Sequence, residues 1–271
     1  MPVATLHLLA LTQGTDPVSL VQQLKQSPNT QVLVASRPRH IVIHPTILDN
    51  NPLATTPWDL LVLLQTTPPT PDPIPPYLRP RIHAEYKLTT GIPSALLSSY
   101  PQRDSTLKSA PHQPLTGSLA ALQQAGGTSS SQNLEVSPPL LRFMDSLSTT
   151  HPGPVTMLNL LHFHPEGKQS YYQYGQAFIP VAGRRGGNAK LVGNVVPPQE
   201  GSDSRGARGN PQEWWNEISI VHYPSIRHFC DMLAGEDYQA INEKYRLSAL
   251  RDTFLLCTTE FDVEGMGGSK L

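Results

Sequence analysis

Residues Trp214–Arg246 read WWNEISIVHYPSIRHFCDMLAGEDYQAINEKYR, which begins as a strand pattern and ends as a helix pattern. The change falls at Tyr-Pro-Ser, where Ser225 is a typical residue to cap the N-terminus of a helix. Beyond it, Phe229, Met232 and Leu233 recur at helical spacing and predict an inward-facing apolar side. The stretch therefore predicts a strand, a capped turn and a helix.

Segments on either side complete an α+β unit. A strand, a helix and a second strand precede the stretch and a further strand follows it, in the order PVTMLNLLHFH (154–164), GKQSYYQYGQAFIPVAGRRGG (167–187), AKLVGNVV (189–196) and TFLLCTTEF (253–261). The order β-α-β-β-α-β is that of the split βαβ unit of ferredoxin-like folds. We therefore expect an antiparallel sheet whose first strand lies between the third and the fourth.

The first hundred residues open in the same order, β-α-β-β, and then depart from it. The run TTPPTPDPIPPYLRP (66–80) cannot form a helix interior or a central strand, so the second helix is predicted to be missing or very short. Residues 101–138 are rich in Gly, Ser, Gln and Pro and are predicted to be a linker. The chain is thus expected to be a tandem of ferredoxin-like units, a degenerate one over 1–100 and a second domain over 139–271.

The composition bounds the partners and the compartment. A net charge of -1 leaves no basic field to hold nucleic acid or an anionic membrane. Two cysteines, Cys230 and Cys257, do not make a disulfide framework and favour a reducing compartment. The apolar run 3–11 follows no basic residue and precedes no cleavage site, so it predicts a strand rather than a signal peptide. No stretch approaches the roughly 20 apolar residues of a membrane helix, and we expect a soluble, cytoplasmic protein.

Four segments together carry a resemblance to a known family. They are VTMLNLLHF, YYQYGQAFIPVAGRRGGNAKLVGNV, the opening stretch and LRDTFLLCTTE, all within residues 152–262. In this order they resemble the DUF1330 family of the dimeric α+β barrel superfamily. The chain departs from the short bacterial members in its long N-terminal half and its extended loop 197–213. It also has His162 and His164 where a basic or polar residue is commoner, and it looks like a two-part fungal version of the family.

The resemblance implies a fold rather than a reaction. In that superfamily two four-stranded sheets close into a barrel with helices outside, and two chains usually supply the sheets. Here the two halves of one chain could supply both, or the C-terminal halves of two chains could pair as a homodimer. Most members of the family have no assigned activity, and the superfamily includes cofactor-free monooxygenases, polyketide cyclases, lactone isomerases and haem proteins, so the fold alone selects none of them.

Strand order places several reactive side chains together. The end of the first strand of the second unit should lie beside the start of the third, which brings His162 near Trp214 and Trp215. Glu217 is flanked by apolar side chains, which would raise its pKa and suit a general base. We take Glu217, His162 and Tyr238 as the candidate catalytic residues.

A pocket between the sheet and its helices, common in the superfamily, would be lined by further polar groups. Asn159 lies in the middle of a strand that is otherwise apolar, where a buried amide needs partners. Tyr171 and Tyr174 point from a helix toward the sheet. These three residues are the candidate substrate-binding groups, with Trp214 and Trp215 as walls.

Each candidate also has a structural alternative. Asn159 could bond to a neighbouring loop, Glu217 could be exposed on an edge strand or pair with an arginine, and the tyrosines could be core side chains with a hydroxyl at the rim. His162 and His164 alternate on one face as metal ligands do, but a third ligand is not evident, so no metal is predicted.

Two functions remain open from the sequence, with a haem-binding protein as a weaker third. One is a cofactor-independent enzyme of the cyclase, isomerase or monooxygenase type that acts on a small hydrophobic or aromatic metabolite. The other is a non-catalytic protein that binds a small molecule or serves in dimerisation. No phosphate-binding loop, nucleophile elbow or paired-cysteine motif occurs, and no cofactor is predicted.

Overall fold

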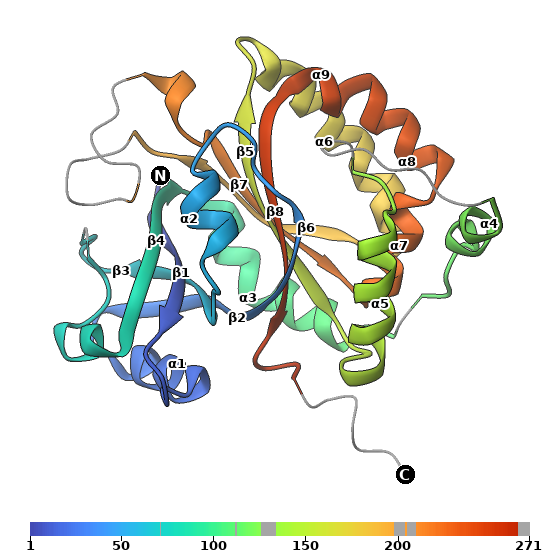
Figure 1. Ribbon diagram of the computed structural model, residues 1–271. Coiled ribbons are helices and arrows are strands. Elements are labelled where there is room, and N and C mark those ends of the chain that lie inside the picture. The colour runs from blue at the N-terminus through green and yellow to red at the C-terminus, as the bar shows by residue number, and fades with distance from the viewer. Residues whose placement is uncertain (71, 112, 126–133, 198–203, 205–209, 265–271) are drawn as a thin grey trace.

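Eight strands form one closed barrel in the computed structural model of the chain (Figure 1). The structure describes residues 1–70, 72–111, 113–125, 134–197, 204 and 210–264. Around the barrel the strands follow the order β1-β3-β2-β8-β5-β7-β6-β4, and all neighbours pair antiparallel. The strands are β1 (Val3–Leu11), β2 (Thr30–Ile43), β3 (Leu60–Thr66), β4 (Ile82–Gly91), β5 (Val155–Phe163), β6 (Asn188–Val195), β7 (Glu217–Tyr223) and β8 (Leu250–Glu260).

The barrel consists of two four-stranded sheets of the same topology. In each sheet the first strand lies between the third and the fourth, giving β4-β1-β3-β2 and β8-β5-β7-β6. One seam is long, with β2 paired to β8 from Ser36–Glu260 to Ile43–Leu255. The other seam has two pairs, Thr90–Val195 and Gly91–Asn194. The barrel therefore closes within one chain, and closing it needs no second copy.

Helices surround the barrel, and the helical segments are α1 (Pro17–Gln26), α2 (Asn50–Thr55), η1 (Pro76–Arg81), α3 (Ser94–Ser109), α4 (Ser118–Ala125), α5 (Pro138–Thr150), α6 (Gly167–Gly183), η2 (Pro211–Glu213), α7 (Ile226–Leu233), α8 (Glu236–Ile241), η3 (Asn242–Arg246) and α9 (Leu247–Ala249). The proline-rich run holds only the short 3-10 helix η1 where a ferredoxin-like unit has its second helix, as predicted. The segment predicted to be a linker carries part of α3 and all of α4, while its residues 112 and 126–133, like most of the loop 197–213, lie outside the described residues. No helix in the described part of the chain is long and apolar enough to cross a membrane.

Side chains from both halves fill the barrel interior. They form one buried cluster that includes Leu6, Leu63, Tyr86, Leu158, Trp215, Ile220 and Leu256. Leu53 of α2 and Tyr100 of α3 belong to the same cluster, so these two helices pack against the interior. The interior is therefore a packed core, and room for a ligand has to be sought on the outer faces of the sheets.

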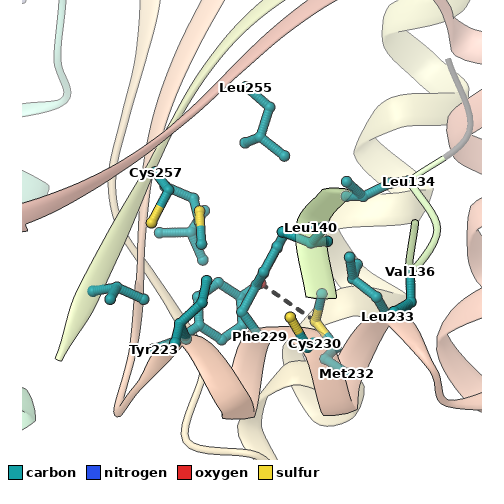
Figure 2. Close-up of a cluster of buried hydrophobic side chains, with 14 of the residues drawn as sticks. Leu134, Val136, Leu140, Tyr223, Phe229, Cys230, Met232, Leu233, Leu255 and Cys257 are labelled. Atoms are coloured by element: carbon teal, nitrogen blue, oxygen red, sulfur yellow. Dashed lines mark hydrogen bonds between the residues drawn. The ribbon is translucent and has the colours of Figure 1, made fainter. Parts of the chain in front are cut away.

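A second apolar layer covers the outer face of the C-terminal sheet. Helices α5, α6, α7 and α8 lie on this side of β5–β8 (Figure 1). Figure 2 shows part of this layer, in which the Tyr223 hydroxyl donates to Met232 Sδ at 3.3 Å. Cys230 and Cys257 are buried in it as free thiols, which agrees with their predicted role as small core side chains.

The joint between β7 and α7 differs in detail from the prediction. Ser225 precedes α7, but its hydroxyl bonds to His228 Nδ1 at 2.8 Å and caps no backbone amide. The helix after this joint is broken at Gly235 into α7 and α8, and an unpredicted π-helical turn, η3, then leads into α9. This π-helical turn carries Arg246, which lines the cavity described next.

Candidate functional site

A cavity of about 630 Å³ lies between α6 and the outer face of the C-terminal sheet. It exists because α6 packs mainly against α8, η3 and α9 and approaches β6 only loosely. At its N-terminal end α6 lies so close to α9 that a Cβ at Gly167 would collide with the carbonyl oxygen of Ala249. Farther along, Gly175 and Gly183 line the cavity, and a Cβ at either would meet nothing within 4 Å. Helix α6 therefore contacts α9 tightly at its N-terminal end and has open space at Gly175 and Gly183.

The floor of the cavity carries three polar side chains from neighbouring strands. Asn159 of β5 pairs with Ser219 of β7, and Leu161 of β5 pairs with Glu217 of β7. Because side chains two residues apart share a face, Asn159, Ser219 and Glu217 all lie on the outer face. The Asn159 amide donates to the carbonyl of Met157 at 3.3 Å. The Asn159 side-chain oxygen and the Ser219 hydroxyl are thus placed to meet a ligand.

Glu217 is the ionisable group of this floor. Burial raises its pKa from 4.5 to about 7, and only the charge of Lys168 opposes the rise. The Lys168 ammonium donates to Asn194 Oδ1 at 2.8 Å instead of to Glu217, whose carboxylate has no hydrogen bond with any residue in the described ranges. A carboxyl group with a pKa near 7 is half ionised at neutral pH and can both accept and return a proton.

The wall of the cavity is aromatic. Tyr171, Tyr174 and Phe178 line it, and their rings follow one another with centroid separations of 5.2 and 5.7 Å. The ring of Phe163 is 5.2 Å from that of Tyr171 but does not line the cavity. Burial raises the pKa of the Tyr171 and Tyr174 hydroxyls above the ordinary value, so both remain protonated and able to donate. This wall suits a flat apolar molecule, and the phenols can hold an oxygen atom on it.

The structure brings four of the predicted residues to this cavity: Asn159, Tyr171, Tyr174 and Glu217. Tyr238 lies behind the wall, where its hydroxyl is 3.3 Å from that of Tyr174. Tyr238 therefore does not line the cavity itself and contacts Tyr174, which does.

The remaining predicted residues lie elsewhere. His162 is completely buried and, as predicted, lies beside the start of the third strand, where its Nδ1 is 3.0 Å from the carbonyl oxygen of Trp214. It is three residues from Asn159, however, so it faces the opposite side of the sheet. Trp215 packs in the barrel interior, and Trp214 does not line the cavity. His164 is exposed.

Among the cavity residues that the sequence prediction missed are Lys168, Ser219 and Arg246. Ser219 had a signal, because it shares the strand face of Glu217 at a spacing of two. No sequence pattern indicated Lys168 or Arg246 as cavity residues, because charged residues in helices usually face solvent.

One cluster elsewhere has acidic groups close enough for a metal. Carboxylate oxygens of Asp104, Glu260 and Asp262 lie within 4.8 Å of one another, the only such group found in the part of the chain that the structure describes. Two ammonium groups already occupy this cluster: Lys108 pairs with all three carboxylates, and the buried Lys190 pairs with Asp104 and Glu260. The cluster is therefore an ion network of three carboxylates and two ammonium groups that fastens α3 to β6 and β8.

Comparison with known proteins finds likenesses to solved structures at low TM-scores. No protein-family model matches the sequence, and no curated protein matches it. A protein of unknown function from Rhodopseudomonas palustris is 25% identical, with 46% of this chain and 94% of that chain covered at a TM-score of 0.33. A Lactobacillus acidophilus protein described as a "putative monooxygenase" is 6% identical, with 96% and 93% covered at 0.46.

A mutant chlorite dismutase from Candidatus Nitrospira defluvii is 11% identical, with 95% of this chain and 90% of that chain covered at a TM-score of 0.42. Likenesses at these TM-scores carry no statement about activity. The strand order of this chain stands without them, and it is that of an α+β barrel made of two ferredoxin-like sheets.

Proposed function

We propose that the chain is a cofactor-independent enzyme that moves a proton on a small, largely apolar or aromatic molecule bound between α6 and the C-terminal sheet. The observation that carries this proposal is a carboxyl group with a pKa of about 7, Glu217, on the floor of an aromatic-walled cavity of about 630 Å³. Cavities of this size hold drug-sized ligands, and a base near neutral pKa suits proton transfer at pH 7.

The proposed step is abstraction of a proton from a carbon next to a carbonyl group. The Glu217 carboxylate takes the proton, and the electron pair of the broken C–H bond moves onto the carbonyl oxygen to form an enolate. The phenol of Tyr171 donates a hydrogen bond to that oxygen, which stabilises the charge as it develops. The protonated Glu217 then returns a proton to the substrate, so the residues of this chain supply every group that the step needs.

Deuterium exchange tests this proposal without knowledge of the natural substrate. A panel of aromatic ketones and lactones with exchangeable α-hydrogens is incubated with the protein in D2O, and deuterium uptake is followed by mass spectrometry. A positioned general base is expected to accelerate exchange by about 10²–10⁴-fold. Glu217→Gln should abolish the acceleration, whereas Glu243→Gln, which changes an exposed glutamate, should preserve it. Binding without accelerated exchange in wild type would make the chain a binding protein instead.

We also propose that the chain is a two-part member of the DUF1330 family. The support is that the four resembling segments coincide with β5, α6, β6, β7, α7, α8 and β8, and that most of the cavity's lining residues lie within these segments. Residues 1–100 would then be the degenerate partner unit, which closes the barrel in place of a second chain.

A further inference from the structure

Arg246 is a buried cation for which the described residues provide no anion. Its side chain is 2% exposed, and it lines both the large cavity and a small adjoining one of about 60 Å³. Within the described ranges its guanidinium forms no hydrogen bond and no ion pair, and Nη2 is buried without a partner. An arginine does not lose its proton in a protein, so the charge stays. Burying an unpaired charge is costly, and such charges are normally paired.

The groups around Arg246 do not neutralise it. Its charge acts on the hydroxyls of Tyr171, Tyr174 and Tyr238, which are neutral donors themselves. Glu217 also acts on Tyr171, but it makes no ion pair with Arg246. Burial raises the pKa of Glu217, and only the charge of Lys168 opposes the rise. The pKa of Tyr171 therefore depends on both charges, while Arg246 and Glu217 lie in different parts of the same cavity.

The backbone holds Arg246 in this position by an irregular turn. Arg246 is the last residue of the π-helical segment η3, between α8 and α9. A single π-helical turn shifts the register of a helix and frequently marks a functional site, because it redirects a side chain that a regular helix would point elsewhere. Here the shifted turn lies against α6, which bears the aromatic wall.

We propose that Arg246 binds the carboxylate of the cavity's ligand, so that the ligand class is small aromatic carboxylic acids. A carboxylate presents two oxygens in the plane that a guanidinium fork matches, and it carries the single charge that one buried cation can balance. The aromatic body would lie along Tyr171, Tyr174 and Phe178. This inference rests on the proposed function of the cavity and adds the anionic group of its ligand.

The test compares two probes of nearly equal shape and different charge, 2-naphthoate and 2-naphthamide, by isothermal titration calorimetry at pH 8. Wild type is expected to bind the acid at least tenfold more tightly than the amide. Arg246→Met should remove this preference by weakening the acid at least tenfold and leaving the amide unchanged. Arg251→Met is the matched control, because Arg251 is an exposed arginine at the rim of the small adjoining cavity, and it should keep the preference.

Three outcomes overturn the inference, and the first two leave the binding site of the proposed function standing. If acid and amide bind wild type alike, the cavity binds ligands but Arg246 selects no anion. If Arg246→Met weakens both probes equally, the arginine supports the cavity wall rather than the carboxylate. If neither probe binds wild type, the inference and the binding site beneath it fail together. Thermal unfolding adds a further readout: a cation without a protein partner should be replaceable by methionine with no loss of melting temperature in the absence of ligand, and a large loss would contradict the proposal.

Discussion

The hydroxyls of Tyr174 and Tyr238 lie 3.3 Å apart and join α6 to α8 behind the aromatic wall of the cavity. Both side chains are buried, and this bond is the contact through which Tyr238 supports the wall. The position of α6 over the sheet is thus supported by a polar contact within a largely apolar layer.

Tyr238→Phe removes this bond and leaves the ring in place. We expect the free energy of unfolding to fall by about 0.5–1.5 kcal/mol, because a buried hydroxyl loses its partner. Tyr172→Phe is the matched control, since Tyr172 lies on the same helix α6 with its side chain 64% exposed, and it should change stability by less than about 0.5 kcal/mol. Urea unfolding measures both, and equal effects would show that the bond adds nothing.

Glu217 makes stability depend on pH in a defined direction. Its pKa is raised from 4.5 to about 7 in the folded protein, so the folded state holds the proton more tightly than the unfolded state. Stability should therefore fall as pH rises from about 4.5 to about 7, by up to about 3 kcal/mol. Glu217→Gln removes this loss, and the variant should gain stability relative to wild type between pH 5 and pH 8.

The measurement is urea unfolding of wild type, Glu217→Gln and Glu243→Gln at pH 5 and pH 8. The exposed Glu243 serves as the control, and its variant should follow wild type at both pH values. A difference between Glu217→Gln and wild type that is the same at pH 5 and pH 8 would show that the pKa of Glu217 is not raised.

Asp231 on α7 ties the segment before α4 to the helical layer. It is completely buried and accepts hydrogen bonds from the backbone amides of Thr116 and Leu119, at 2.9 and 3.0 Å, while Arg185 lies 3.4 Å away. Burial opposes ionisation, but these donors and the arginine hold the pKa of Asp231 below its ordinary value. Its carboxylate is therefore the ionised centre of a buried network.

Asp231→Ala should lower the free energy of unfolding by about 3–5 kcal/mol, because it leaves Arg185 and two amides without this partner. Asp145→Ala is the control on the neighbouring helix α5. Asp145 is 65% exposed in its ion pair with Arg227, so its removal should cost about 0–1 kcal/mol. Chemical denaturation compares the two, and a small loss for Asp231→Ala would mean that water replaces the network at little cost.

The sequence predicted much of the fold because most elements have local signals. Strand and helix patterns located β5 to β8 and α6, and the prolines of 66–80 located the place where a helix is lost. Helix α3 escaped prediction because Pro101 lies inside it and few of its residues are apolar. Its place is fixed by distant partners, with Arg103 donating to the carbonyl of Lys190 at 2.9 Å, and no local pattern encodes such a contact.

The candidate site was predictable where strand alternation applies and not beyond it. The positions of Asn159 and Glu217 in the cavity follow from the register of β5 and β7. The same alternation would have excluded His162 from the cavity, because it is an odd number of residues from Asn159. Trp215 precedes β7 and turns into the barrel, which alternation within the strand does not determine. Arg246 depends on a π-helical turn, which a 3.6-residue period does not anticipate.

Gly175 lines the cavity beneath α6, and a larger side chain at this position would fill that cavity. A side chain at Gly175 would meet open space, and replacing a glycine inside a helix should stabilise the fold slightly or leave it unchanged, by about 0–1 kcal/mol. Gly175→Leu should therefore close the binding site without unfolding the protein.

The deciding measurement is equilibrium dialysis of wild type and Gly175→Leu against one mixture of small aromatic compounds, with bound compounds identified by mass spectrometry. We predict that wild type retains at least one compound, that Gly175→Leu loses it, and that both proteins melt at similar temperatures. Retention of the same compounds at the same level by both proteins, or retention of none by wild type, would contradict the proposal that this cavity is the functional site.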